Sequence, residues 1–178
     1  MAKETLSRAT CAADSDAPRI RALAARDVPA VLEIIAAARA EYGMAERLDS
    51  VLEPADLELL KTYQRERSAY FVAMTGSRVV GGAGIAPLAG ADDLTCELQR
   101  MYLRADVRGR GLGSQLLKAC TDAARTFGFQ ACYAETIHQM QDAIRFYIGS
   151  GFHRLEGPIG QTGHEHNDCW LLLDMGRD

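Results

Sequence analysis

Three glycines alternate with other residues between Arg108 and Ser114, in the run Arg-Gly-Arg-Gly-Leu-Gly-Ser. Glycine permits positive φ angles and has no Cβ to keep a ligand away from the backbone. Where such a loop opens a helix, its backbone N–H groups converge on an anion and the helix dipole adds to the attraction. Arg108 and Arg110 add positive charge beside it. The loop therefore predicts a site for a phosphate ester or a diphosphate.

The positions of these glycines separate the loop from two common nucleotide-binding motifs. A Walker loop ends in Gly-Lys followed by Ser or Thr, whereas Gly113 is followed by Ser114 and Gln115. A dinucleotide fingerprint reads Gly-x-Gly-x-x-Gly, whereas the glycines here stand at 109, 111 and 113. Both motifs fit poorly, and a nucleotide-binding module is left as an alternative.

A second group of reactive side chains lies near the end of the chain, where His164, Glu165, His166 and Asp168 are close in sequence. On a strand, His164 and His166 would point to the same side, because side chains alternate. Such a cluster could bind a metal, line a substrate pocket or lie in a solvated loop. Metal analysis of the purified protein would test the first of these alternatives.

The hydrophobic pattern predicts the elements that position these residues. The glycine loop follows a strand at 94–103 and opens a helix at 112–127, which leads to a strand at 131–135. This crossover implies one parallel strand pair. The other expected elements are a strand at 19–24, helices at 27–43, 54–67 and 139–148, a hairpin of strands 69–74 and 79–87, and strands at 152–156 and 169–174.

These elements predict an α+β fold, with a single central sheet that is mixed but mostly antiparallel and has helices on both faces. Asp27 stands where a helix N-cap would. Glycines in the second hairpin strand indicate that something packs closely there; they are Gly81, Gly82 and Gly84. Alternation in the strand before the loop predicts two faces, Glu97, Gln99 and Met101 on one and Leu98, Arg100 and Tyr102 on the other.

Length and composition suit one globular domain, at 178 residues with 48% hydrophobic and 25% charged residues. We expect residues 1–18 to form a flexible N-terminal arm and residues 19–178 to form the domain. The net charge of −4 argues against a nucleic-acid partner. No run approaches the roughly 20 apolar residues of a membrane-spanning helix. Five scattered cysteines without a CxxC pair are typical of reduced thiols in the cytoplasm, where we place the protein.

The spacing Arg-x-x-Gly-x-Gly, from Arg108 to Gly113, resembles the pyrophosphate signature of the GNAT acyltransferase superfamily. Downstream, Tyr147 followed by Gly151-Phe152 resembles the end of that superfamily's penultimate helix, and a looser similarity extends over residues 19–174. The stretch 97–103 resembles an uncharacterised bacterial subgroup. The resemblance implies the GNAT fold and transfer of an acetyl group from acetyl-CoA to a primary amine of a small molecule or amino acid.

The same resemblance implies a binding mode for acetyl-CoA as co-substrate, with no metal. Backbone groups of Met101, Tyr102 and Leu103 would pair with the pantetheine arm. The thioester would lie where the strands on either side of the glycine-loop helix splay apart. Many family members carry an Asn where this chain has Met140, so one cofactor contact is in doubt. The pyrophosphate would be held by Arg108, Gly109, Arg110, Gly111, Leu112, Gly113 and Ser114.

The resemblance also implies which residues act as general acid and general base in the acetyl transfer. Tyr147 is the candidate general acid for the leaving CoA thiolate. A base is needed because an alkylamine is mostly protonated at neutral pH and only its neutral form attacks a thioester. Glu97 is the first candidate, because several family members carry a carboxylate on this strand, and Glu135 is the second. The candidates for the acceptor pocket are Glu135, His138, His164 and His166.

The acceptor itself has no diagnostic motif. A small-molecule amine is the expected partner, but a protein N-terminus or lysine is an alternative, and so is a non-catalytic acyl-CoA-binding or sensor domain on the same fold. Thiol release that an amine accelerates would favour the enzyme, whereas stronger stabilisation by ATP or NAD than by CoA would favour a nucleotide-binding module. A homodimer is a further expectation from the resemblance.

Overall fold

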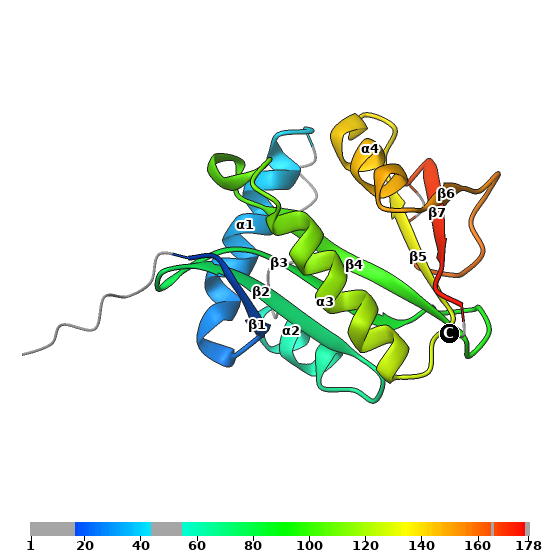
Figure 1. The fold of residues 1–178 in the computed structure, drawn as a ribbon, viewed down its shortest axis with the longest axis horizontal. Coiled ribbons are helices and arrows are strands. Elements are labelled where there is room, and N and C mark those ends of the chain that lie inside the picture. Colours follow the sequence, from blue (N-terminus) through cyan, green and yellow to red (C-terminus); the bar gives the residue numbers. More distant parts are fainter. Residues whose placement is uncertain (1–16, 44–54, 165, 177–178) are drawn as a thin grey trace, which may run out of the picture.

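The computed structural model describes residues 17–43, 55–164 and 166–176. Most of the expected N-terminal arm lies outside these residues. Figure 1 shows one central sheet with helices packed on it. The strands are β1 (Arg19–Ala22), β2 (Ala69–Thr75), β3 (Arg78–Pro87), β4 (Thr95–Leu103), β5 (Ala131–Thr136), β6 (His153–Arg154) and β7 (Cys169–Asp174). The helices are α1 (Val28–Ala40), α2 (Ala55–Tyr63), α3 (Leu112–Thr126) and α4 (Gln141–Gly149), with short 3₁₀ turns at Ala25–Asp27 and Ala105–Val107.

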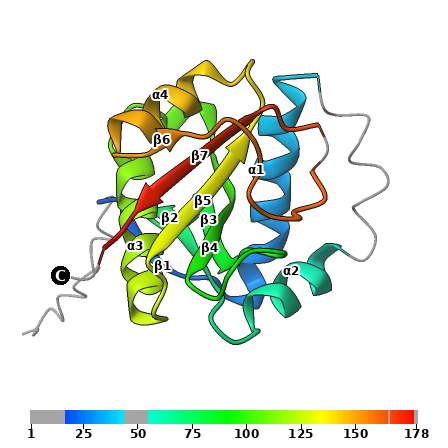
Figure 2. The ribbon, with the colours of Figure 1, turned by 90° about the vertical axis from the view of Figure 1, so that its right-hand side faces the viewer.

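The sheet has seven strands in the order β1-β2-β3-β4-β5-β7-β6 within the described residues. All neighbouring strands pair antiparallel except β4 and β5, which α3 connects as a parallel pair. Figure 2 shows α3 and α4 on one side of the sheet and α1 and α2 on the other. The predicted α+β class, with a mixed sheet covered on both faces, is confirmed.

Each face of the sheet has its own hydrophobic core. On one face, Leu112, Leu116 and Cys120 of α3 pack with Ile144 and Tyr147 of α4. On the other face, buried side chains of α1 and α2 pack against the sheet. They include Val28, Val31, Ile35, Leu59 and Tyr63 of the helices and Tyr70 of β2. No helix in the described ranges is long and apolar enough to cross a membrane.

The glycines of β3 make room for two tyrosine rings. The rings of Tyr63 and Tyr70 pack together with centroids 4.9 Å apart. A Cβ added at Gly84 would lie 2.5 Å from Cε1 of Tyr63 and 2.6 Å from Cδ2 of Tyr70, and a Cβ at Gly82 would lie 2.5 Å from Cε1 of Tyr70. The close packing predicted from the glycines is therefore present.

A β-bulge interrupts β4 at the point where it approaches the glycine loop. Gly82 pairs with Tyr102 and Gly84 pairs with Gln99, so two β4 residues stand opposite one residue of β3. Arg100, inside the bulge, has a positive φ of 50°. The predicted alternation fails here, because the extra residue reverses the faces beyond it. Met101 packs against the α3-side core, whereas Tyr102 packs against the α1-side core.

The parallel pair of β4 and β5 is short. Its register covers Thr95–Ala131, Cys96–Cys132 and Glu97–Tyr133, although β4 continues to Leu103 and β5 to Thr136. The two strands therefore separate beyond Glu97, as Figure 1 shows. The splay expected from the family resemblance lies at this point.

The predicted N-cap position is confirmed, because Asp27 is the N-cap residue of α1, although its side chain makes no capping hydrogen bond to the helix. Instead, both of its carboxylate oxygens bind the Arg21 guanidinium, at 2.5 and 2.8 Å, and one accepts the Ala24 N–H at 2.8 Å. This lowers the pKa of Asp27 and fastens β1 to the start of α1. In addition, α2 ends at Tyr63, four residues before the predicted Arg67, and β6 is shorter than predicted.

The close approach at Gly84 gives a first prediction. Gly84→Ala should destabilise the fold by about 1–3 kcal/mol, because the methyl group overpacks two buried rings. Gly149→Ala is the matched control, since a Cβ there meets no atom within 4 Å, and it should be neutral or slightly stabilising. Urea denaturation followed by circular dichroism measures both, and equal free energies of unfolding for the two variants would contradict the packing described.

Candidate active site

A first cavity of about 550 Å³ opens beside the end of β4, between the glycine loop and α4. It brings together residues that lie far apart in the sequence. The side walls are Ala38 and Tyr42 from α1 and its C-terminal end, and Phe146 and Tyr147 from α4. Its other lining residues include Met101, Tyr102, Leu103, Arg108, Gly109, Gly111, Gly113 and Ser114. Most residues expected to hold the cofactor therefore line one cavity.

The glycine loop has the backbone expected of an anion site. Gly109 and Gly111 have φ angles of +73° and +79°, and a Cβ at either would meet no atom within 4 Å. Gly111 immediately precedes α3, whose first N–H groups have no intrahelical acceptor. Two expected ligand residues differ from the rest: the Leu112 side chain is buried in the α3-side core, and Arg110 is exposed without lining the cavity. Only the backbone of Leu112 could face an anion.

Arg108 is held in place from two sides. Its guanidinium donates two hydrogen bonds to Glu41, at 2.6 and 2.8 Å, and its Nε donates to the Leu103 carbonyl at 3.0 Å. The hydrogen bonds with Glu41 raise the pKa of Arg108, and the same bonds lower the pKa of Glu41. Arg108 therefore connects the glycine loop to the end of β4 and to the C-terminal end of α1.

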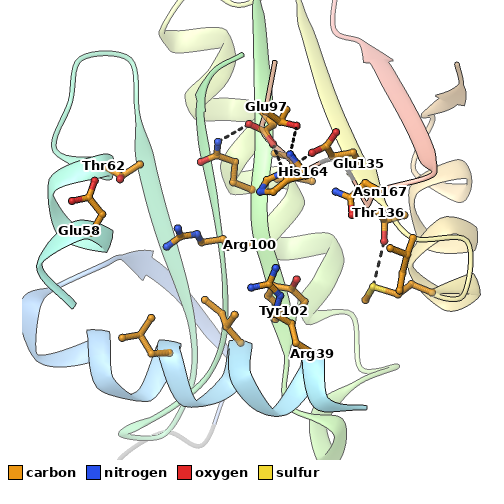
Figure 3. Close-up of a pocket in the computed structure, with 17 residues that line it drawn as sticks. Arg39, Glu58, Thr62, Glu97, Arg100, Tyr102, Glu135, Thr136, His164 and Asn167 are labelled. Carbon is orange, nitrogen blue, oxygen red and sulfur yellow. Dashed lines mark hydrogen bonds and ion pairs between the residues drawn. The ribbon is translucent and has the colours of Figure 1, made fainter. Parts of the chain in front are cut away.

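A second cavity of about 470 Å³ lies on the α1–α2 face of the sheet. Figure 3 shows its side chains. They come from α1, α2, β4, the end of β5 and the β6–β7 connection; the polar ones are Arg39, Glu58, Thr62, Glu97, Gln99, Arg100, Tyr102, Glu135, Thr136, Thr162, His164 and Asn167. Tyr102 and Met140 line both cavities, so the two cavities adjoin where β4 and β5 separate.

Two buried glutamates and a histidine meet at one end of this second cavity. The ring Nδ1 of His164 lies 2.5 Å from Oε1 of Glu135 and 3.9 Å from Oε1 of Glu97. Tyr133 donates its hydroxyl to Glu135 at 2.9 Å, and Gln99 donates its amide to Glu97 at 2.6 Å. The carboxylates are almost fully buried, with side chains 5% and 4% exposed, whereas the His164 side chain is 50% exposed.

The surroundings push the pKa values of the two carboxyl groups apart. Burial raises the pKa of Glu97, and the hydrogen bond from Gln99 only partly offsets this effect. Burial also acts on Glu135, but hydrogen bonds from His164, Thr162 and Tyr133 outweigh it and lower the pKa of Glu135. The hydrogen bond to Glu135 raises the pKa of His164 above its usual value. The cluster therefore favours the ionised form of Glu135 and the protonated form of His164, beside a Glu97 whose pKa is raised.

The same three residues offer ligand atoms that lie within 4.8 Å of one another, as a metal site would. Ligand atoms on one tetrahedral zinc ion, bound at about 2.0–2.2 Å, are separated by roughly 3.3 Å. Nδ1 of His164 and Oε1 of Glu135 are only 2.5 Å apart. This separation is typical of two groups that share a proton and is too short for two ligands of one metal ion. The absence of a metal cofactor stays a prediction.

Tyr147 presents its ring to the first cavity from α4. The ring packs between Phe146 and Phe152, with centroids 5.5 and 5.3 Å away, and the residue is 8% exposed. Burial raises the pKa of its hydroxyl, so this group stays protonated at neutral pH. The hydroxyl has no hydrogen-bond partner among the described residues, so the protein leaves it available to a ligand in the cavity that Tyr147 lines.

The histidines are separated by the structure. Neither His164 nor His166 lies in a strand, so the condition under which they would point to the same side is not met. His138 and His166 are exposed and line neither cavity, and the His138 N–H donates to the carboxylate of Asp168. Glu165 lies outside the described residues. Of the predicted histidines, His164 alone reaches a described cavity.

Several polar residues that line the second cavity were not predicted from the sequence. Arg39 and Arg100 line the second cavity, together with Glu58 and Thr62 of α2 and Asn167 of the β6–β7 connection. These residues carry no motif, and they come together only through the tertiary fold. The sequence placed Arg100 with Leu98 and Tyr102, and nothing in it indicated the bulge.

The chain belongs to the acetyltransferase (GNAT) family, whose model matches residues 31–152. It is therefore an acyl-CoA-dependent acetyltransferase. It is 39% identical over 159 residues to the uncharacterized N-acetyltransferase YjgM of Escherichia coli (strain K12), a match that covers 89% of this chain and 95% of that protein.

Two solved structures show the same fold. A GNAT-family acetyltransferase from Staphylococcus aureus Mu50 superposes with a TM-score of 0.78 at 17% identity, covering 90% of this chain and all (100%) of that one. YncA from Salmonella typhimurium, solved with acetyl-CoA, superposes with a TM-score of 0.69 at 21% identity, covering 91% and 96%. The family fold expected from the glycine loop and the Tyr147 helix is confirmed.

The contact between His164 and Glu135 gives a second prediction. A pH titration of the His164 ring by NMR should give a pKa above the usual value of about 6.5, because the carboxylate stabilises the imidazolium. Glu135→Gln should lower that pKa, since it removes the negative partner. Glu33→Gln, on the exposed face of α1, is the matched control and should leave it unchanged.

The contact between His164 and Glu135 also makes the stability of the fold depend on pH. The raised pKa of His164 contributes stability that is fully present below the unfolded pKa of histidine and is lost as the pH rises through the folded value. Glu135→Gln should therefore destabilise the fold more at pH 6 than at a pH above the folded His164 pKa. A His164 titration that is identical in wild type and Glu135→Gln would contradict the pair.

Proposed function

We propose that the protein transfers an acetyl group directly from acetyl-CoA to the primary amine of a small molecule. The observation that carries this proposal is the junction of the two cavities where β4 and β5 separate. Tyr147 lies on the first cavity and Glu97 on the second, so a thioester at the junction has a proton donor on one side and a proton acceptor on the other.

Two parts of acetyl-CoA have matching features along the first cavity, the pyrophosphate and the pantetheine arm. The glycine loop offers free backbone N–H groups and the start of α3 to the pyrophosphate. Beyond Glu97, β4 has no pairing with β5, so its backbone from Gln99 to Leu103 is open on that side. The pantetheine arm would pair with this open edge as an added strand, which supports the roles of Met101, Tyr102 and Leu103.

Glu97 is the general base in this proposal. It lines the cavity beside the junction, and burial raises its pKa, which makes it a stronger base than an exposed glutamate. Its carboxylate lies 3.9 Å from Nδ1 of His164, whose side chain is half exposed, so the base is close to a group in contact with solvent. Glu135 is the weaker candidate base, because its carboxylate is already bound by His164 and Tyr133.

Tyr147 gives a third prediction. Tyr147→Phe should lower kcat by about 100-fold or more, because the leaving thiolate loses its proton donor. The affinity for CoA should change little, since the ring and its packing between Phe146 and Phe152 are kept. Thiol release measures turnover and isothermal titration calorimetry measures CoA binding. A variant with wild-type kcat would exclude Tyr147 as the acid.

Glu97 gives a fourth prediction. In the wild type, kcat/KM should fall as the pH drops through the raised pKa of Glu97, because a protonated carboxyl group cannot accept the amine proton. Glu97→Gln should lower the rate by about 100-fold or more and remove this acid limb. The same amine is used throughout, so its own titration affects both proteins equally. Glu33→Gln is the control, and full activity of Glu97→Gln at every pH would refute the assignment.

The experiment that tests the function as a whole is an amine panel with acetyl-CoA, followed by the release of free thiol. Slow release without an acceptor, accelerated by at least one small amine, is the expected result. CoA binding without acceleration by any amine would favour a non-catalytic acyl-CoA-binding domain instead. Acceleration only by peptides with a free N-terminus or lysine would favour a peptide acetyltransferase.

A further inference from the structure

The second cavity carries charges of opposite sign at its two ends. Glu97, Glu135 and His164 form the acidic end, as described above. At the other end, Arg39 from α1 and Arg100 from β4 contribute two guanidinium groups. Figure 3 shows Arg100 extending from β4 toward the α2 side of the cavity, and Arg39 lying beside Tyr102.

Neither guanidinium is fully paired by the protein. Arg100 makes no hydrogen bond or ion pair through its side chain with any described residue, and it is exposed to the cavity. Glu58 faces it across the cavity without forming an ion pair. The Nε of Arg39 is buried and has no hydrogen-bond partner among the described residues. A charged donor without an acceptor is costly, and an anionic ligand in the cavity would supply acceptors to the exposed Arg100 guanidinium.

The backbone of Arg100 supports the same interpretation. Its positive φ of 50° is a conformation that residues with side chains rarely adopt, and it results from the bulge opposite Ala83. The bulge turns the arginine into the cavity at a position three residues along β4 from the candidate base Glu97. Strained backbone of this kind is retained where the position of a functional group depends on it.

We propose that the acceptor is an amino acid or a closely related amino-carboxylate, with its carboxylate bound by Arg100 and Arg39 and its amine directed to Glu97 at the junction. This inference rests on the proposed function and deepens it. Arg–carboxylate pairs form two parallel hydrogen bonds, so they fix the orientation of the ligand as well as holding it. A cavity of about 470 Å³ suits a molecule of this size.

The test compares acceptors that differ only in the anionic group. Purified full-length protein is assayed by thiol release with acetyl-CoA and a panel of L-amino acids, each beside its carboxamide and its decarboxylated amine. The expected result is that at least one amino acid exceeds its two uncharged counterparts by about 10-fold or more in kcat/KM, since a charged hydrogen bond is lost without the carboxylate. Equal or greater activity with the uncharged counterparts throughout would overturn the inference.

Variants then assign the effect to the arginine. Arg100→Gln should lower kcat/KM for the preferred amino acid by about 10- to 100-fold, mainly through KM, and leave its carboxamide and the CoA affinity unchanged. Arg100→Lys should retain part of the activity. Arg125→Gln, which removes the same charge from exposed α3, is the control. A purely structural role for Arg100 would lower the melting temperature and weaken all acceptors alike, and that outcome would refute the proposal.

Binding measurements keep this inference separate from the proposed function. Isothermal titration of the amino acids into the CoA-bound protein tests the anion site without turnover. Binding that Arg100→Gln weakens, with no acetylation of any amine in the panel, would support the amino-carboxylate site and refute the proposed transfer to small-molecule amines. Acetylation of uncharged amines alone would refute the site and leave the acetyl transfer standing. If no amino acid is bound and none is acetylated, the inference is overturned.

Discussion

The arrangement of the site depends on the early end of pairing between β4 and β5. The two strands are paired with each other only as far as Glu97 and Tyr133, and beyond that point each is paired only with its other neighbour, β4 with β3 and β5 with β7. Backbone groups of a strand cannot remain unpaired in a dry interior, so this separation requires either water or a ligand between the strands. The opened edge of β4 faces the first cavity, and both cavities meet at Tyr102 and Met140 where the strands part. A fully paired sheet would have closed this junction.

The packing of the α1–α2 face extends to the candidate base through a chain of hydrogen bonds. Gly84 leaves room for the Tyr63 ring, whose hydroxyl donates to Oε1 of Gln99 at 3.0 Å. The amide of Gln99 then donates to Glu97 at 2.6 Å. This chain orients a carboxylate that the fold would otherwise disfavour. An acid whose pKa is higher in the folded than in the unfolded state destabilises the fold at neutral pH, and burial raises the pKa of Glu97 in this way.

Local signals in the sequence account for the cofactor side of the site. The glycine spacing, the helix that follows it and the position of Tyr147 before Gly151-Phe152 are short-range features, and each lies on or beside the first cavity. The mixed sheet also followed from local patterns, since one crossover implies one parallel pair. The acceptor side could not be predicted in this way. The bulge at Arg100 depends on its register with β3, and His164 reaches Glu135 from a segment without regular structure, 29 residues away in the sequence.

The cofactor side could be predicted from the sequence and the acceptor side could not, and this difference has a physical cause. An anion is bound by the backbone of one loop and one helix start, so a short run of residues is sufficient and leaves a readable pattern. The acceptor cavity instead needs a wall on every side, and this chain builds it from α1, α2, β4, β5 and the β6–β7 connection. Each element contributes between one and four polar residues, at positions that its own periodicity does not distinguish from surface positions. Arg108 joins the two sides, because it leaves the glycine loop to bind Glu41 at the end of α1. The cofactor loop and the end of the helix that carries Arg39 are thus joined by two hydrogen bonds between oppositely charged side chains.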